Sequence, residues 1–265
     1  MARSSQADHL AGLPSGGQRL TAGCTRRLER MPIPDSSQAV SGPDHLHGSH
    51  AGHGTEVQFS QDFWEQRYQS NPSVWSGNPN PHLISEAADL TPGRALDVGA
   101  GEGADALWLA KRGWQVTAAD ISTVALERGA SHAREAGDEV AARIDWLHAD
   151  LTAWVPQPMT FDLVSAQFMH LPKPQRDAMV ARLAMSVVAG GTLLIVGHHP
   201  SDLQTTIPRP PMPELFFTAA DIADTLNAEQ WDILVSDARP RKATDPDGRP
   251  VTIHDAVLRA QRHSS

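Results

Sequence analysis

Residues 95–103 read Ala-Leu-Asp-Val-Gly-Ala-Gly-Glu-Gly, an apolar run followed by three alternating glycines. The run has the composition of a buried strand, and residues 104–112 continue with the apolar spacing of a helix. Glycines at such a turn let the backbone bend sharply and approach a ligand with no Cβ in the way. The free N–H groups at the start of the helix face the same place. This strand, loop and helix predict an α/β fold with a nucleoside-cofactor site.

Segments typical of strands alternate with segments typical of helices along the rest of the chain. Such alternation indicates a mostly parallel sheet covered by helices on both faces. The apolar centre of residues 191–197 suits a strand buried on both faces, and the last two strands should form an antiparallel hairpin at one edge. Strands are expected at 94–99, 115–120, 143–148, 161–166, 191–197, 230–238 and 251–260, and helices after Ser60 and at about 81–90, 103–112, 122–136, 173–188 and 218–227.

The glycine loop also matches the fingerprint of dinucleotide-binding folds, because Gly99, Gly101 and Ala104 have the spacing G-x-G-x-x-G/A. Asp120 ends the second predicted strand, where a carboxylate can accept hydrogen bonds from both hydroxyls of a ribose. Both features fit a nicotinamide dinucleotide as well as S-adenosylmethionine. An NAD(P)-dependent oxidoreductase is therefore one alternative, and a cofactor-binding regulatory module without catalysis is another.

Three further features favour S-adenosylmethionine. Asp97 lies inside the end of the first predicted strand, where its negative charge would repel a pyrophosphate but suits the ammonium of a methionine group. Asp150 follows the third strand and is in position to accept from the adenine amino group. Residues 167–170, Gln-Phe-Met-His, follow the fourth strand, where the cofactor and the methyl acceptor should meet. Together these positions indicate S-adenosyl-L-methionine as the cofactor.

With these residues in place, residues 60–260 resemble the class I S-adenosylmethionine-dependent methyltransferases. The resemblance implies a seven-stranded Rossmann-like sheet of order 3-2-1-4-5-7-6 with one antiparallel strand. Residues 64–68, Trp-Glu-Gln-Arg-Tyr, followed by Trp75, are similar to the aromatic front segment of the thiopurine and tellurite-resistance methyltransferase group. In that group the segment closes over the methionine end of the cofactor. The resemblance implies a small, soft or aromatic-heterocyclic acceptor methylated on S, N, Se or Te. For a small-molecule acceptor in general, oxygen is a further possible acceptor atom.

The motifs and the resemblance together give a set of expected cofactor-binding residues. Most of them belong to the glycine loop and to the ends of the parallel strands, and the aromatic ones belong to the front segment. The set is Trp64, Tyr68, Trp75, Asp97, Gly99, Ala100, Gly101, Asp120, Ile121, Asp150, Leu151 and Gln167.

Histidines at two strand ends are the candidate catalytic residues. Methyl transfer from a sulfonium mainly requires that acceptor and methyl are held close and aligned, so no metal is expected. A thiol acceptor needs little help to lose its proton at neutral pH, whereas an amine or hydroxyl benefits from a base. His170 follows the fourth strand and His198 the fifth, at the carboxyl ends where ligands bind in such sheets. His170 is the first candidate for a base and His198 the second.

The charge of the chain favours a small-molecule acceptor. The formal net charge is −9, and it falls on residues 58–265, because the first 57 residues have equal numbers of basic and acidic side chains. Phosphate binding needs clustered Lys and Arg, so no nucleic acid is expected as a partner. Cys24 is the only cysteine, which excludes a disulfide within one chain. No stretch is long and apolar enough to cross a bilayer. We expect a soluble cytoplasmic protein, monomeric or homodimeric.

Two segments outside the alternating pattern have distinct compositions. Residues 1–57 are rich in Ser, Gly, Pro, Arg and His, which predicts a disordered leader ahead of a methyltransferase domain at 58–265. The leader holds four histidines between 45 and 53, but its glycines and serines offer no supporting shell for a metal, and none is assigned. Residues 200–216 contain five prolines and form the candidate lid over the site.

Overall fold

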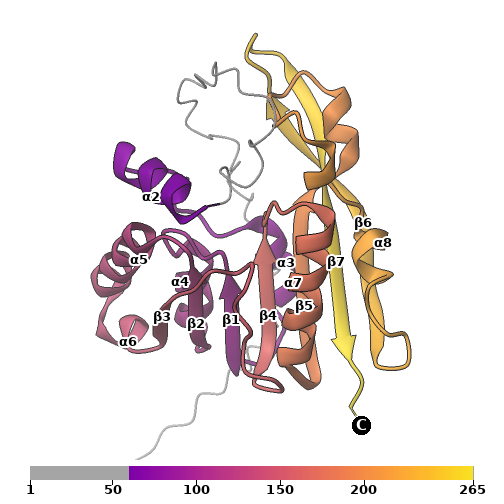
Figure 1. The fold of residues 1–265 in the computed structure, drawn as a ribbon. Helices are drawn as coiled ribbons and strands as arrows, with labels where there is room; N and C mark the ends of the chain where they lie inside the picture. The colour runs from indigo at the N-terminus through magenta and orange to yellow at the C-terminus, as the bar shows by residue number, and fades with distance from the viewer. Residues whose placement is uncertain (1–59, 265) are drawn as a thin grey trace, which may run out of the picture. The chain divides into compact units, whose positions relative to one another are not determined.

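The computed structural model describes residues 60–264, which contain a seven-stranded sheet flanked by helices (Figure 1). Its strand order is β3-β2-β1-β4-β5-β7-β6, so the expected order is confirmed. β7 runs antiparallel to both of its neighbours, and the remaining pairs are parallel. The strands are β1 (Arg94–Val98), β2 (Gln115–Asp120), β3 (Ile144–His148), β4 (Phe161–Gln167), β5 (Val187–His198), β6 (Trp231–Thr244) and β7 (Pro250–Arg262).

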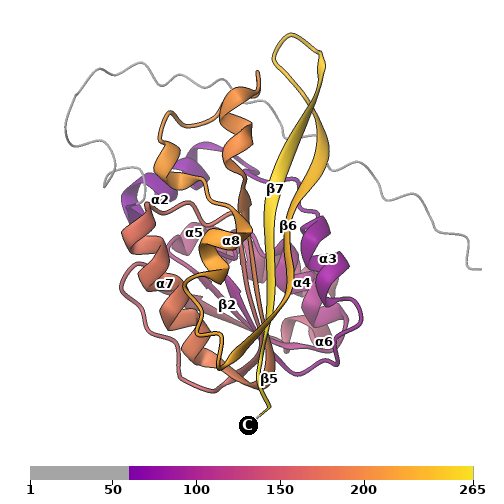
Figure 2. The same cartoon turned by 90° about the vertical axis from the view of Figure 1, so that its right-hand side faces the viewer.

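Helices cover both faces of the sheet (Figure 2). α7 and α8 lie on one face, and α3 and α4 lie on the other. α2 begins at the predicted N-cap, Ser60, whose hydroxyl accepts a hydrogen bond from the Phe63 N–H. The helices are α2 (Gln61–Ser70), α3 (Pro81–Ala87), α4 (Ala104–Lys111), α5 (Thr123–Ala136), α6 (Asp138–Ala141), α7 (Lys173–Ser186) and α8 (Ala219–Ala223).

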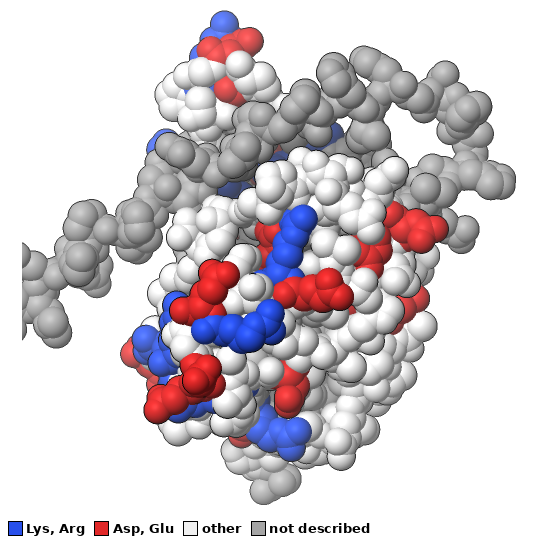
Figure 3. Space-filling model, turned by 90° about the vertical axis from the view of Figure 1, so that its left-hand side faces the viewer, with Lys and Arg blue, Asp and Glu red and all other residues white. Residues whose placement is uncertain are grey.

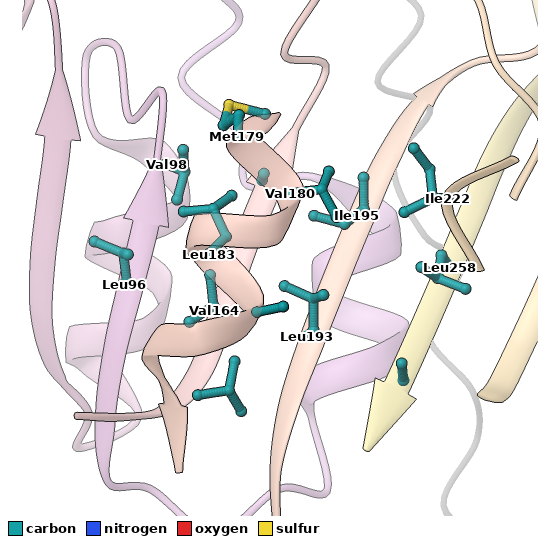
Figure 4. Packing of buried hydrophobic residues seen from close by; sticks show 14 of the residues in the cluster. Leu96, Val98, Val164, Met179, Val180, Leu183, Leu193, Ile195, Ile222 and Leu258 are labelled. Carbon is teal, nitrogen blue, oxygen red and sulfur yellow. The ribbon is translucent and has the colours of Figure 1, made fainter. Parts of the chain in front are cut away.

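The sheet is buried on both faces, as its apolar strands predict. Side chains alternate between the faces of a strand, so β5 contributes Leu193 and Ile195 to the cluster under α7 and α8. Leu194 and Val196 of the same strand belong to the cluster under α3 and α4. Figure 4 shows the first cluster, in which Leu183 of α7 packs among residues of β1, β4 and β5. The packed core fixes the strand ends that carry the site.

Some segments differ from their prediction. The helix expected at 173–188 stops at Ser186, and the strand expected from residue 191 already begins at Val187, so that Gly190 and Gly191 lie inside β5. The 200–216 segment contains two 3₁₀ turns, Pro200–Gln204 and Pro213–Leu215, between its prolines. α6 was not expected at all. β6 was expected to end at residue 238 but continues to Thr244, whereas β7 differs from its predicted bounds by only one or two residues at each end. The hairpin of the two strands projects beyond the carboxyl ends of the parallel strands (Figures 1 and 2).

The predicted boundary between residues 57 and 58, and the leader with Cys24 and its histidines, lie outside the described residues. Within residues 60–264 no helix is both long enough and apolar enough to span a membrane. Acidic and basic side chains are intermixed on the face shown in Figure 3, which is the face of α5 and α6 in Figure 1.

Candidate cofactor and acceptor site

The glycine loop lies directly under the front segment. Gly99 and Gly101 have φ angles of +73° and +53°, a region that side chains disfavour. A Cβ on Gly101 would lie 2.9 Å from the Tyr68 hydroxyl and 3.3 Å from Trp75 Nε1. A Cβ on Gly99 would collide with the Met169 sulfur. The loop therefore presents bare backbone between the front segment and the segment that follows β4.

Two carboxyl groups at the loop are held in environments that disfavour their charge. Asp97 is 2% exposed, and its Oδ2 has no hydrogen-bond partner among residues 60–264. Burial raises the pKa of Asp97 well above its usual range, and the charges of Asp105 and Asp120 raise it further. Burial also raises the pKa of Asp105 to about 6, although the Asn80 N–H donates to its Oδ1 at 2.6 Å. A cation beside these groups would favour their ionised forms.

Asp120 and Asp150 come from neighbouring strand ends, as predicted. The carboxylate of Asp120 accepts hydrogen bonds from the Gly101 N–H at 2.8 Å and the Ser122 N–H at 2.9 Å. Burial raises the pKa of Asp120, and these donors oppose the rise. Asp150 is exposed, and its Oδ1 accepts from the N–H and hydroxyl of Thr152. Asp120 thus ties the glycine loop to the end of β2.

The aromatic residues of the front segment meet over the loop. The Trp75 indole N–H donates to the Tyr68 hydroxyl at 2.9 Å. The carboxylate of Glu102 accepts from the N–H groups of Val74 and Trp75. Arg128 of α5 bridges the two parts, because it pairs with Glu102 at 2.9 Å and donates to the Tyr68 carbonyl at 2.7 Å. The sequence reading missed Glu102 and Arg128, since neither belongs to a recognisable spacing.

The Glu65 side chain connects α2 to the start of α5 by hydrogen bonds. Its carboxylate accepts from the N–H groups of Thr123 and Val124 and from the hydroxyls of Ser122 and Thr123. Burial alone would raise the pKa of Glu65, but these four donors hold it below its usual value. A carboxylate at a helix N-terminus also interacts favourably with the helix dipole. This residue was likewise missed, because its role depends on a tertiary contact.

The two candidate histidines lie together after β4 and β5. The rings of His170 and His198 stack with centroids 4.7 Å apart at 20°. Phe168 contacts His198 at 4.8 Å between centroids, and Phe216 of the 200–216 segment lies at 6.2 Å. Burial, with smaller contributions from His198 and Arg209, lowers the pKa of His170 to about 3. His170 is therefore a neutral imidazole at physiological pH.

A buried carboxylate on β7 lies behind His198. Asp255 is the direct cross-strand partner of His198 and is 1% exposed. It accepts hydrogen bonds from His82 Nε2 at 3.0 Å and Arg241 Nε at 2.8 Å. Burial would raise the pKa of Asp255, but His198, His82 and Arg241 hold it far below its usual range. An acid within an otherwise buried strand is unusual, and that signal could have drawn attention to Asp255 in the sequence.

The predicted residues thus form two adjoining groups at one edge of the sheet. Tyr68, Trp75, Asp97, Gly101 and Asp120 surround the glycine loop. Trp64 lies on α2, with its ring 6.3 Å from the Tyr68 ring. The remaining predicted cofactor residues belong to the loop or follow the ends of β2, β3 and β4, and the histidine pair lies at the ends of β4 and β5. These residues are Gly99, Ala100, Ile121, Asp150, Leu151 and Gln167, with His170 and His198.

Comparisons with known proteins agree with this arrangement. Residues 95–191 match the family described as "Methyltransferase domain". A ubiquinone biosynthesis O-methyltransferase of Xylella fastidiosa is 31% identical over 139 residues, which are 52% of this chain and 54% of that protein. The chain spans about half the length of the curated relatives it matches.

Solved structures share the fold at low sequence identity. TehB from Haemophilus influenzae aligns over 77% of this chain and 66% of its own, with a TM-score of 0.57 and 19% identity. Magnesium protoporphyrin IX methyltransferase from Synechocystis, solved with bound SAH, aligns over 80% of this chain and 90% of its own, with a TM-score of 0.50 and 20% identity.

Proposed function

Because residues 95–191 match the family described as "Methyltransferase domain", we propose that the chain is a class I methyltransferase that transfers a methyl group from S-adenosylmethionine to a small-molecule acceptor. The observation that carries the proposal is the buried Asp97 carboxyl beside the glycine loop, whose Oδ2 has no hydrogen-bond partner among residues 60–264. The family match favours methyl transfer over the oxidoreductase interpretation of the glycine fingerprint. The non-catalytic interpretation is an outcome of the experiment below.

The residues of the site fit the cofactor. Its methionine end carries an ammonium and its sulfur is a cation, and Asp97 and Asp105 are carboxyl groups whose ionised forms need a nearby positive charge. Gly99 and Gly101 let Met169, Tyr68 and Trp75 approach the loop backbone closely, so these side chains would border a ligand bound at the loop. Asp120 keeps unused acceptor lone pairs after its two backbone hydrogen bonds, which suits ribose hydroxyls.

The residues of the chain then supply binding, orientation and exclusion of water. When bound, the cofactor supplies an electrophilic methyl group and a neutral leaving group. Asp97 and Asp105 would hold the methionine end, Asp120 the ribose, and Asp150 the adenine. Tyr68 and Trp75 cover the loop and would exclude water from the reacting centre, where alignment provides most of the rate.

An oxygen atom is the acceptor that we favour. The similar Xylella fastidiosa protein is named as an O-methyltransferase, and the chain carries imidazoles at the strand ends where a hydroxyl would need a base. A soft sulfur or selenium acceptor, as the thiopurine and tellurite-resistance resemblance implies, would need none.

A product assay tests the proposal. The full chain is incubated with S-adenosylmethionine and separate sets of phenols, thiols and heterocyclic amines, and mass spectrometry follows adenosylhomocysteine and the gain of one CH₂ unit in each acceptor. We expect both products with at least one set and neither with Asp97→Asn. Tight adenosylhomocysteine binding without turnover of any acceptor would instead favour a non-catalytic binding module.

A further inference from the structure

Three polar atoms near the end of β5 are buried and unpartnered. They are Nε2 of His170, Nδ1 of His198 and Nε of Arg209, and none has a hydrogen-bond partner among residues 60–264. Arg209 belongs to the 200–216 segment, where its Nη2 pairs with the fully buried Asp202 at 2.9 Å. Buried polar atoms are nearly always hydrogen-bonded. His170 Nε2 and Arg209 Nε indicate a polar ligand that completes them, whereas His198 Nδ1 faces the Asp255 carboxylate at 3.8 Å.

The surroundings of these atoms are flat and aromatic. The His198 ring stacks on His170 and lies beside Phe168 and Phe216. Aromatic faces at these separations favour offset or edge contacts with another planar ring. Met169, the neighbour of His170, lies against Gly99 of the cofactor loop. A planar acceptor bound here would therefore adjoin the cofactor.

Asp255 lies on the Nδ1 side of the His198 ring. Its Oδ1 lies 3.8 Å from His198 Nδ1, and its Oδ2 is bound by His82 and Arg241. A carboxylate on the Nδ1 side favours the tautomer with its proton on Nδ1. The lone pair of that tautomer is on Nε2, on the other side of the ring. His170 has no carboxylate in contact among the described residues, so the two imidazoles are not equivalent.

We propose that His198 is a catalytic base for an aromatic hydroxyl acceptor and that Asp255 is the positioning residue that sets its tautomer. The proposal rests on the proposed methyl transfer and names its acceptor class. The acceptor O–H bond breaks, its proton passes to Nε2 of His198, and the electron pair stays on the oxygen, which becomes the nucleophile. The negative charge of Asp255, with Oδ1 3.8 Å from His198 Nδ1, stabilises the resulting imidazolium.

The charged groups around His198 are consistent with this role. Burial lowers the pKa of His198, Asp255 opposes the lowering, and Arg209 and Arg241 reinforce it. His82 and Arg241 neutralise part of the Asp255 charge, and His170 is neutral. The balance leaves His198 uncharged at neutral pH and able to accept a proton. Removing the Asp255 charge should lower the pKa of His198 further.

The tautomer of His198 is measurable without an acceptor. Long-range ¹H–¹⁵N spectra of the labelled full chain, free of cofactor, report which nitrogen carries the proton, and His198→Gln identifies the signal. We expect Nδ1–H at neutral pH in the wild type, and loss of that preference with a lower titration midpoint in Asp255→Asn. Asparagine is chosen because its side-chain oxygen can still accept the hydrogen bonds from His82 and Arg241. An Nε2–H tautomer in the wild type, or an unchanged spectrum in Asp255→Asn, would overturn the proposal.

Asp245→Asn is the matched control. Asp245 is a second buried acid of the same hairpin, 5% exposed, and it accepts from backbone N–H groups of the turn and from Thr206. Its removal should leave the His198 signal unchanged. If Asp255→Asn does not fold, the wild-type tautomer and the phenol titration below decide the question.

A chromogenic phenol tests proton removal directly. 4-Nitrophenol is titrated into the wild type saturated with adenosylhomocysteine, at a pH below the pKa of the free phenol, where its phenolate band is weak. We expect the phenolate band to grow on binding to the wild type and to remain weak with His198→Gln. Absence of binding, or equal bands with both proteins, would overturn the proposal. Adenosylhomocysteine binding is measured in the same samples, so failure of the cofactor assignment is seen separately.

Discussion

At the scale of single residues, the candidate site contains carboxyl groups whose ionised forms are destabilised by burial when no ligand is bound. Asp97 is buried without a partner at Oδ2, and Asp105 lies close enough to raise its pKa. A buried unpaired charge is costly unless a counter-ion is supplied. We propose that the cationic end of the cofactor supplies that counter-ion. Affinity for the ligand and stability of the free protein are therefore opposed at these positions.

Asp97→Asn should separate the two effects. We expect the Kd for adenosylhomocysteine to rise by at least about tenfold, which corresponds to ~1.4 kcal/mol, because the ammonium loses its carboxylate. Thermal stability should stay the same or increase, because the buried acid is replaced by a neutral amide. Calorimetry and thermal melts measure the two quantities. Asp162→Asn is the control, since Asp162 binds the Arg94 N–H at the opposite end of β1; an equal loss of affinity in both variants would contradict this role.

Cofactor binding should release protons near the pKa of Asp105. In the unliganded fold this pKa is about 6, against an ordinary value of 3.8. Ionisation therefore disfavours the free fold as pH rises through this range, and a bound cation reverses the penalty. Affinity should increase from about pH 5 to about pH 7. Calorimetry near pH 6 in buffers of different ionisation enthalpy measures the released protons, and identical heats in all buffers would disprove the linkage.

At the scale of elements, α2 is attached to the domain mainly by polar contacts. Glu65 binds the start of α5, while Arg128 and Glu102 hold the following turn. Few of its side chains are buried, and Tyr68 is the one buried residue of the helix. Elements with such limited burial open more easily than the core. We infer that the front segment closes over the cofactor and opens to release it.

Removing the Glu65 carboxylate should therefore weaken the cofactor more than the fold. In Glu65→Ala we expect faster dissociation of adenosylhomocysteine and a severalfold higher Kd, because α2 loses the four hydrogen bonds that link it to the start of α5. The melting temperature should change little, because these contacts lie outside the buried core. Stopped-flow tryptophan fluorescence, with Trp64 and Trp75 as reporters, measures the rate. Glu135→Gln, at the far end of α5 and exposed, serves as the comparison. A large drop in stability with unchanged dissociation would refute this assignment.

The Glu65 contact also has a defined pH dependence. Its folded-state pKa is lowered, so its contribution is present above the ordinary pKa of 4.5 and is lost as pH falls through the folded-state value. The closure should thus persist throughout the physiological range.

At the scale of the whole molecule, the sheet order followed from the alternation of strands and helices together with the resemblance. The strand bounds were predicted within a residue or two for β1 to β4, because each is a short apolar run between clear turns. The outer end of β6 was underestimated, because residues 239–244 pair only with β7 and none of them is buried, so they lack a buried apolar pattern. Periodicity reports burial and does not detect such pairing.

The site could be predicted only in part for a related reason. Asp97, Asp120 and Asp150 follow predicted strands, and parallel strand ends meet at one edge of a sheet. Asp255 comes from the antiparallel strand, where the carboxylate reaches the same edge from the opposite chain direction. Glu65 and Arg128 act across elements that are distant in sequence. Contacts of this kind require the tertiary structure.

A cavity in the hydrophobic core should lower the stability of the whole domain without changing cofactor affinity. Leu183 of α7 is 2% exposed in the cluster of Figure 4, so Leu183→Ala should lower the free energy of unfolding by about 2–5 kcal/mol. Cofactor affinity should be unchanged at temperatures where the variant is folded, because no site residue moves. Urea denaturation and calorimetry measure these quantities. A selective loss of affinity with normal stability would show that α7 shapes the site directly.

The central claim is that the loop at Gly99–Gly101 and its carboxylates bind an S-adenosyl compound. Isothermal calorimetry of the full chain with adenosylhomocysteine and, separately, with NAD tests it most directly. The account predicts saturable binding of adenosylhomocysteine and far weaker binding of NAD. Equal or tighter binding of NAD, or no heat with adenosylhomocysteine at any concentration up to the millimolar range, would contradict it.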